Sequence, residues 1–166
     1  TQWVAENFRL SETKKVSCLE VLGYHWPSND PPPASVFDVV IYGVANGGVP
    51  GAVLHESRGI EARRQKTGTV SFGLEEWRFT IELPSPVELA AGDFFAELSG
   101  AAATGGSFCW IGGEKDLVAG LNGMAFRNIG SWSLGTWDLA FKVFEAGIFV
   151  DGFESGTMEE WSGHLP

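Results

Sequence analysis

Histidine is the side chain that most often exchanges protons near neutral pH, and this chain contains His25, His55 and His164. Nucleophilic catalysis needs such a base within reach of a serine, threonine or cysteine. His25 and His55 each end an apolar, strand-like run, and His164 lies near the end of the chain. The sequence contains no GxSxG, HExxH or phosphate-binding motif. We therefore predict no catalytic residues and a protein that is not an enzyme.

Acidic residues are plentiful, and two carboxylates across a cleft could hydrolyse a glycoside. The obvious pairs, Glu75-Glu76 and Glu159-Glu160, are adjacent in sequence, and neighbouring residues of a strand point to opposite faces. No three or four ligands have the spacing of a zinc site, and the dense aspartate pattern of a calcium loop is missing. We predict no metal and no cofactor, and leave open calcium binding by scattered loop oxygens.

Aromatic side chains could bind a polysaccharide by stacking on sugar rings. Tyr24, Trp26, Trp132 and Trp137 are the candidates for such a glycan-binding platform. With seven tryptophans in the chain, most are expected in the core. A carbohydrate-binding module is therefore the alternative function.

The two cysteines, Cys18 and Cys109, each lie inside an apolar run. We predict a disulfide between them, as expected in an oxidising compartment. The alternative is a pair of buried free thiols.

The formal net charge is -10, from 11 basic and 21 acidic residues. Nucleic-acid affinity depends largely on cationic side chains, so a nucleic-acid partner is excluded, and anionic membranes are disfavoured. The one basic cluster, residues 58–66 (RGIEARRQK), predicts a solvated loop or a charged edge strand. No run of about 18 apolar residues exists, so we predict no membrane span.

Short apolar runs separated by Gly/Pro turns predict an all-β fold. Residues 76–83 (EWRFTIEL) alternate apolar and polar side chains, which indicates a half-buried strand ended by Pro84 and Pro86. Other strands are predicted at residues 16–26, 36–44, 52–55, 93–98, 108–111, 124–127 and 137–144. Without helices between them, they favour an antiparallel two-sheet β-sandwich of jelly-roll type, with a closed barrel as the alternative.

Several phrases of the sequence resemble a recurrent β-sandwich module of secreted bacterial proteins. The resemblance covers roughly residues 8–145 and depends on FDVVIYGVANGGVPGAVLHE, LAAGDFFAELSG, FCWIGG, AFRN and GTWDLAFKVFE. Residues 148–154 (IFVDGFE), followed by SGTMEEWSG, are similar to a C-terminal signature of exported bacterial proteins. Together with a start at Thr1 that suits removal of a leader, these likenesses imply a secreted, extracellular or cell-surface protein.

We predict a β-sandwich domain at residues 1–145 and a C-terminal tail at 146–166 that contains a short apolar strand. Ile148, Phe149, Val150 and Phe153 would form this assembly strand. It would add to an open sheet edge of its own chain or of another copy. Repeated head to tail between copies, this contact makes a homo-oligomer or filament, so a self-assembling structural subunit is the leading functional prediction.

Overall fold

The computed structural model describes residues 3–27, 34–100, 107–113, 124–128, 130–135 and 138–145. These residues form twelve strands and no helix. The strands are β1 (Trp3–Leu10), β2 (Lys14–Trp26), β3 (Ser35–Val44), β4 (Pro50–Ser71), β5 (Leu74–Leu89), β6 (Gly92–Gly100), β7 (Ser107–Trp110), β8 (Gly112–Gly113), β9 (Ala125–Asn128), β10 (Ser131–Leu134), β11 (Asp138–Leu139) and β12 (Phe141–Glu145). None of the described segments is a helix that could cross a membrane.

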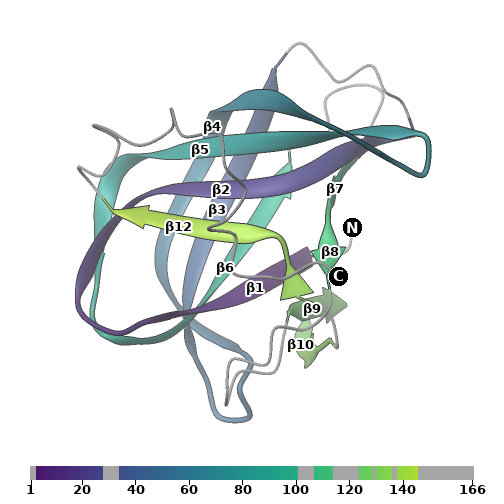
Figure 1. Cartoon of the computed structure of the whole chain (residues 1–166). Coiled ribbons are helices and arrows are strands. Elements are labelled where there is room, and N and C mark those ends of the chain that lie inside the picture. Colours follow the sequence, from purple (N-terminus) through teal and green to yellow (C-terminus); the bar gives the residue numbers. More distant parts are fainter. Residues whose placement is uncertain are drawn as a thin grey trace.

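All the strand pairings are antiparallel, which confirms the all-β, antiparallel prediction. Ten strands form a continuous sheet in the order β10-β9-β1-β6-β3-β4-β5-β2-β12, with β7 beside one end of β2 (Figure 1). The remaining two, β8 and β11, pair with each other. Within the long sheet, β1 pairs with β6, β2 with β5 and β3 with β4. In sequence, the β3–β4 pair therefore lies inside the β2–β5 pair, which lies inside the β1–β6 pair.

The sheet folds back on itself along β4. Residues 50–62 of this strand pair with β3, whereas residues 63–71 pair with β5. The two halves of the sheet therefore face each other across a common core. The Phe37 ring of β3 lies 5.5 Å from the Phe79 ring of β5, and both lie within 5.4 Å of the Phe108 ring of β7.

Alternation of side chains builds this core from both halves. Its fully buried members include Leu19 and Val21 from β2, Val39 and Ile41 from β3, and Ile81 from β5. The apolar side of the predicted strand at residues 76–83 does face this core.

The structure corrects two predicted strand boundaries. The strand predicted to end at Pro84 and Pro86 continues to Leu89. Opposite Ser17, β5 has four residues, 83–86, between the pairs Cys18↔Glu82 and Val16↔Val87. A bulge of this kind leaves the prolines outside the regular ladder, so their missing amide hydrogens cost nothing.

The strand predicted at residues 52–55 is also much longer, because β4 extends to Ser71. Most of its side chains are exposed, and each part of β4 has one described neighbour, so it lacks the apolar pattern of an interior strand. The basic cluster at residues 58–66 lies within β4, so it belongs to a strand and not to a loop.

Replacing the central ring of the core tests whether the two halves pack as described. We expect Phe79→Ala to lower the free energy of unfolding by about 3–5 kcal/mol, because it leaves a cavity between β3, β5 and β7. Chemical denaturation measures this change. Val70→Ala, at a side chain that is 64% exposed, is the control and should change stability by less than about 0.5 kcal/mol. Equal effects of the two substitutions would contradict the packing.

Candidate functional site

Two strand edges lie next to each other on the side of the molecule opposite the β4 fold. β9 pairs with only Trp3, Val4 and Ala5 of β1, so residues 6–10 pair with β6 alone among the described strands. β12 likewise pairs with β2 and with no other strand that the structure describes. The Phe8 and Phe141 rings lie 5.8 Å apart, so the two edges are neighbours (Figure 1). We call this feature, formed by residues 6–10 and 141–145, the β1–β12 seam.

The direction of the two edge strands limits what can fit between them. From β1 through β6, β3, β4, β5 and β2 to β12 there are six antiparallel steps, so β1 and β12 run in the same direction. A strand inserted between them would run antiparallel to both. Antiparallel pairing is the pattern of every other contact in the sheet, so such a strand continues the existing ladder on both sides.

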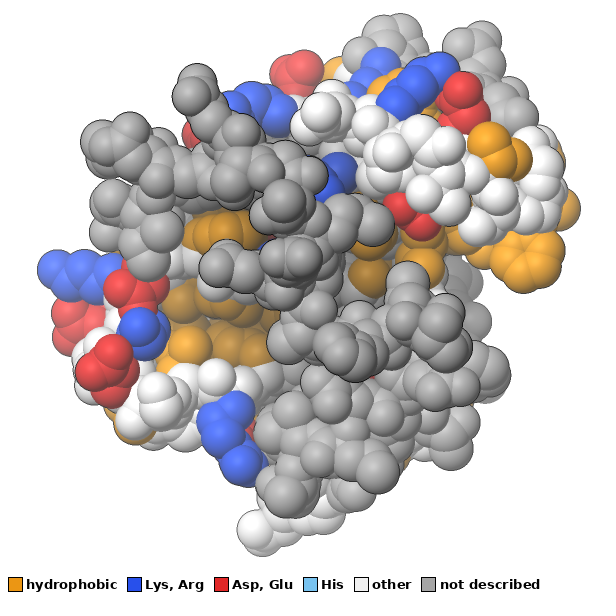
Figure 2. All heavy atoms as spheres, viewed as in Figure 1, with side chains coloured by type: hydrophobic (Ala, Val, Ile, Leu, Met, Phe, Trp, Pro, Cys, Tyr) orange, Lys and Arg blue, Asp and Glu red, His pale blue; other side chains and the backbone are white. Residues whose placement is uncertain are grey.

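The seam is lined with apolar side chains. Phe8 and Leu10 of β1, together with Phe141 and Val143 of β12, pack against the main core but stay partly exposed. Hydrophobic side chains are visible at the surface around β12 and between it and β1 in Figure 2. An extended segment with alternating apolar residues would find both backbone partners and apolar contacts here.

Glu6 occupies one end of the seam and is almost fully buried. Its Oε1 accepts a hydrogen bond from the Asn7 amide at 3.0 Å, and its Oε2 accepts one from the Leu139 amide of β11 at 2.6 Å. The carboxyl group therefore takes the place of a neighbouring strand at this point of the β1 edge. Burial is the main cause that raises the pKa of Glu6 to about 8, and nearby Asp138 raises it further.

Hydrogen bonds hold the residue that precedes β12. Ala140 donates to the Ile111 carbonyl at 2.9 Å and accepts from the Leu22 amide at 3.2 Å. The Trp110 indole also donates to the Ala140 carbonyl, at 2.8 Å. These contacts fix the start of β12 against β2 and the end of β7.

The residues predicted to supply the assembly strand, Ile148, Phe149, Val150 and Phe153, lie outside the described residues, as do Trp137 and His164. What the structure does describe is the end of β12 at Glu145, immediately before this segment and at the seam itself.

The remaining aromatic candidates do not form one platform. Tyr24 and Trp26 project from the same outward side of β2, because His25 between them points inward against Phe79. Trp132 belongs to β10, in the other half of the sheet. Its ring contacts Tyr42 edge-on at 5.7 Å and lies 5.1 Å from the Arg127 guanidinium, so it serves local packing.

The predicted disulfide is not formed, because Cys18 and Cys109 are not joined to each other in the structure. Cys18 pairs across the sheet with Glu82, and Cys109 pairs with Tyr24, six residues further along β2. Six strand residues span about 20 Å, whereas a disulfide needs Cα atoms about 6 Å apart. Burial raises the pKa of both thiols, which keeps them protonated and unreactive.

The described histidines have local partners. His25 is buried, with its Nε2 3.5 Å from the Ser35 hydroxyl, and burial lowers its pKa. His55 lies 2.8 Å from Ser57 on the same strand. No group of three His, Cys, Asp or Glu side chains that could hold a metal occurs in the described part of the chain.

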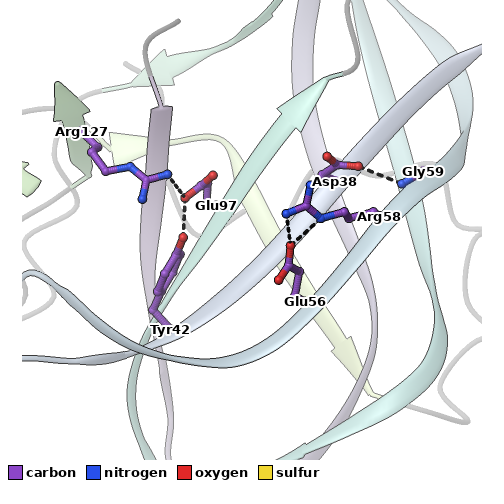
Figure 3. Close-up of polar contacts among 7 residues, drawn as sticks. All are labelled: Asp38, Tyr42, Glu56, Arg58, Gly59, Glu97 and Arg127. Carbon is purple, nitrogen blue, oxygen red and sulfur yellow. Dashed lines mark hydrogen bonds and ion pairs between the residues drawn. The ribbon is translucent and has the colours of Figure 1, made fainter. Parts of the chain in front are cut away.

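A polar cluster on the outer face of β3 and β6 attaches the β9–β10 hairpin (Figure 3). The buried Glu97 carboxylate accepts a hydrogen bond from the Tyr42 hydroxyl at 2.7 Å and lies 3.7 Å from Arg127. Burial and this hydrogen bond raise the pKa of Tyr42. Since Trp132 reaches Tyr42 from four strands away in the sheet order, the hairpin must curl over this face. Asp38, Glu56 and Arg58 lie farther along the same face, where Asp38 accepts from the Gly59 amide at 2.8 Å.

Sequence reasoning missed the seam because it did not recognise β1. The signal was present, since Glu6, Phe8 and Leu10 alternate along one side of residues 3–10. That this side meets β12 depends on tertiary structure. Comparison with known protein families, curated proteins and solved structures finds no match to this chain.

The buried Glu6 predicts a pH dependence of stability. Its pKa is raised from 4.5 to about 8, so the folded chain holds this proton more tightly than the unfolded chain between these values. The contribution to stability is complete below about pH 4.5 and is lost as the pH rises toward 8. Between about pH 5 and pH 8, we expect the wild type to lose about 3 kcal/mol more than Glu6→Gln. Denaturant titrations at several pH values measure this, and the exposed Glu88→Gln should keep the wild-type slope.

The hydrogen bond from Tyr42 to Glu97 predicts that removing the Tyr42 hydroxyl lowers the free energy of unfolding. Tyr42→Phe leaves the buried Glu97 with one donor fewer, so the free energy of unfolding should fall by about 1–3 kcal/mol. Tyr24→Phe, the same change at a half-buried site in the other half, is the control and should cost less than about 1 kcal/mol. An unchanged thermal midpoint for Tyr42→Phe would mean that this hydrogen bond is not needed.

Proposed function

We propose that this protein is a non-catalytic, extracellular or cell-surface structural subunit that assembles with copies of itself by strand addition at the β1–β12 seam. One observation is the main support. Two strand edges of the same direction lie side by side over partly exposed apolar side chains, at the point where the chain leaves β12. Strand addition at a sheet edge, with apolar side chains filling the adjacent pockets, is a recurrent mode of recognition.

We further propose a jelly-roll-type sandwich as the finer description of the fold. The nested pairs β1–β6, β2–β5 and β3–β4 support it, because rolling one long hairpin produces a jelly roll. In this description the two sheets are the halves that β4 joins, and the seam is the side where they stay unjoined.

The C-terminal segment has a suitable pattern for the donor strand. Ile148 and Val150 fall on one face of an extended chain, whereas Phe149, Asp151 and Phe153 fall on the other. Burying the Asp151 carboxylate without a partner would be costly, so Ile148 and Val150 are the side chains to face the seam lining. Phe149 and Phe153 would then add apolar surface outside.

Turn chemistry favours a donor from another copy over the chain's own tail. Glu145 is the last residue of β12, so a two-residue hairpin that starts the donor strand at Ile148 would turn at Ala146-Gly147. A type I′ turn needs positive φ at both central residues, and a type II′ turn needs glycine first. Ala-Gly supplies neither. A tail that continues away from its own seam can enter the seam of a neighbour, and this head-to-tail contact repeats into a filament.

The location is proposed from sequence likeness. The resemblance of several phrases to secreted bacterial β-sandwich modules, and the likeness of residues 148–154 to a signature of exported proteins, are the support for an extracellular or cell-surface subunit.

Carbohydrate binding is the second candidate, and one observation favours it. The Trp26 side chain is 54% exposed and lies on the same side of β2 as Tyr24, which offers two neighbouring aromatic groups to a sugar chain.

Charge placed in the donor segment tests assembly. We expect the full-length protein to be larger than a monomer in light scattering and to form linear particles in electron micrographs. Ile148→Asp combined with Val150→Asp should yield monomers, because two carboxylates cannot enter the apolar seam.

The matched control is Ser155→Asp combined with Thr157→Asp, which adds the same charge to the tail outside the apolar segment and should leave assembly intact. A monomeric wild type would contradict the proposal. Assembly that persists in the protein with Ile148→Asp and Val150→Asp would contradict it as well. If the wild type is monomeric and these two substitutions lower its thermal midpoint, the tail closes its own seam instead.

A further inference from the structure

The β4–β5 hairpin extends beyond the sandwich and ends in a two-residue turn (Figure 1). Ser71 pairs with Leu74, and Phe72 and Gly73 between them have φ values of 55° and 76°. Positive φ at both central residues defines a type I′ turn, where asparagine, aspartate or glycine is usual. Phe72 is the only non-glycine residue with positive φ among the described residues.

Phenylalanine at this position is unfavourable in two ways. A bulky side chain is strained in the left-handed region of backbone conformation. The ring is also 88% exposed to solvent, the most exposed large apolar side chain that the structure describes. Neither property helps the chain fold, so the placement calls for an external contact.

The turn residues around Phe72 are uncharged. Residues 67–74 (TGTVSFGL) contain no Asp, Glu, Lys or Arg, and Val70 is also largely exposed. Glu75, which pairs with Val70 across the hairpin, forms an ion pair with Lys66 at 2.5 Å. The Thr67 hydroxyl donates to the Glu76 carbonyl and accepts from the Thr69 amide, which satisfies polar groups inside the hairpin. Backbone that is hydrogen-bonded internally can leave water at little cost.

Behind the tip lies a collar of cationic and aromatic side chains. The Arg64 guanidinium and the Lys66 ammonium lie 5.5 and 5.2 Å from the centre of the Trp77 ring. Lys66 pairs with Trp77 across the hairpin, three residues behind the turn at Leu74. At about 3.3 Å per residue, the collar stands about 10 Å behind the turn.

We propose that this hairpin docks on a lipid surface, with Phe72 and Val70 entering the interfacial region of the bilayer and Trp77, Arg64 and Lys66 at the level of the head groups. The collar distance agrees with the depth of about 5–10 Å to which interfacial apolar groups enter. Tryptophan, lysine and arginine are the side chains that prefer this boundary. The carboxylate beside Val70, Glu75, is already paired with Lys66, and the Thr67 hydroxyl makes its hydrogen bonds within the hairpin. A neutral phospholipid is therefore the chemistry that fits it.

The test uses the full-length protein and vesicles of pure phosphatidylcholine in a sedimentation assay. We expect wild-type protein to sediment with the vesicles. Phe72→Asn should reduce the partition coefficient by about 10- to 100-fold, the loss expected for one buried phenylalanine. Asparagine suits the type I′ turn, so this variant should keep or raise the thermal midpoint of the wild type, and lost binding cannot then be attributed to unfolding.

Leu54→Asn is the matched control, because Leu54 is a half-exposed apolar residue of β4 away from the tip. It should bind vesicles like the wild type. The proposal would be overturned if Phe72→Asn bound vesicles as well as the wild type does. It would also be overturned if Leu54→Asn lost as much vesicle binding as Phe72→Asn. A wild type that does not sediment with phosphatidylcholine would overturn it too, in which case a protein pocket for Phe72 replaces the lipid.

Discussion

Contact between the two halves of one sheet is the interaction on which the rest of this structure depends. β4 changes partners from β3 to β5, and the rings of Phe37, Phe79 and Phe108 meet where the halves face each other. A single sheet of this size with one apolar face would leave that face in water. Folding the sheet across β4 buries its two halves against each other. The nested pairing of β1 with β6, β2 with β5 and β3 with β4 belongs to the same folded arrangement.

The same fold brings the edges of β1 and β12 together on its far side. Because β1 and β12 run in the same direction, they cannot continue the antiparallel ladder by pairing with each other. The chain satisfies part of the β1 edge with the Glu6 carboxyl group and fixes β12 through Ala140. Burial of a carboxyl group at a strand edge is costly, so the two hydrogen bonds that Glu6 accepts offset part of this cost.

The seam and the β4–β5 tip both arise where regular pairing stops. One is an edge with apolar lining, and the other is a turn with an exposed ring. They belong to different parts of the molecule, so assembly through the seam would leave the tip exposed on every subunit. Many weak surface contacts on one assembly add up to firm attachment, because the second contact is made at high effective concentration.

The sequence by itself determined the all-β class and the alternating strand within β5, since these depend on local patterns of residue type. It did not determine the passage of β5 beyond Pro84 and Pro86, which depends on a bulge opposite Ser17. It also misjudged the cysteines, because both lie in apolar strands but their separation depends on register along β2. Only the tertiary structure decided that Glu6, Phe8 and Leu10 meet β12, since residues more than 130 positions apart become neighbours only after the sheet has folded over.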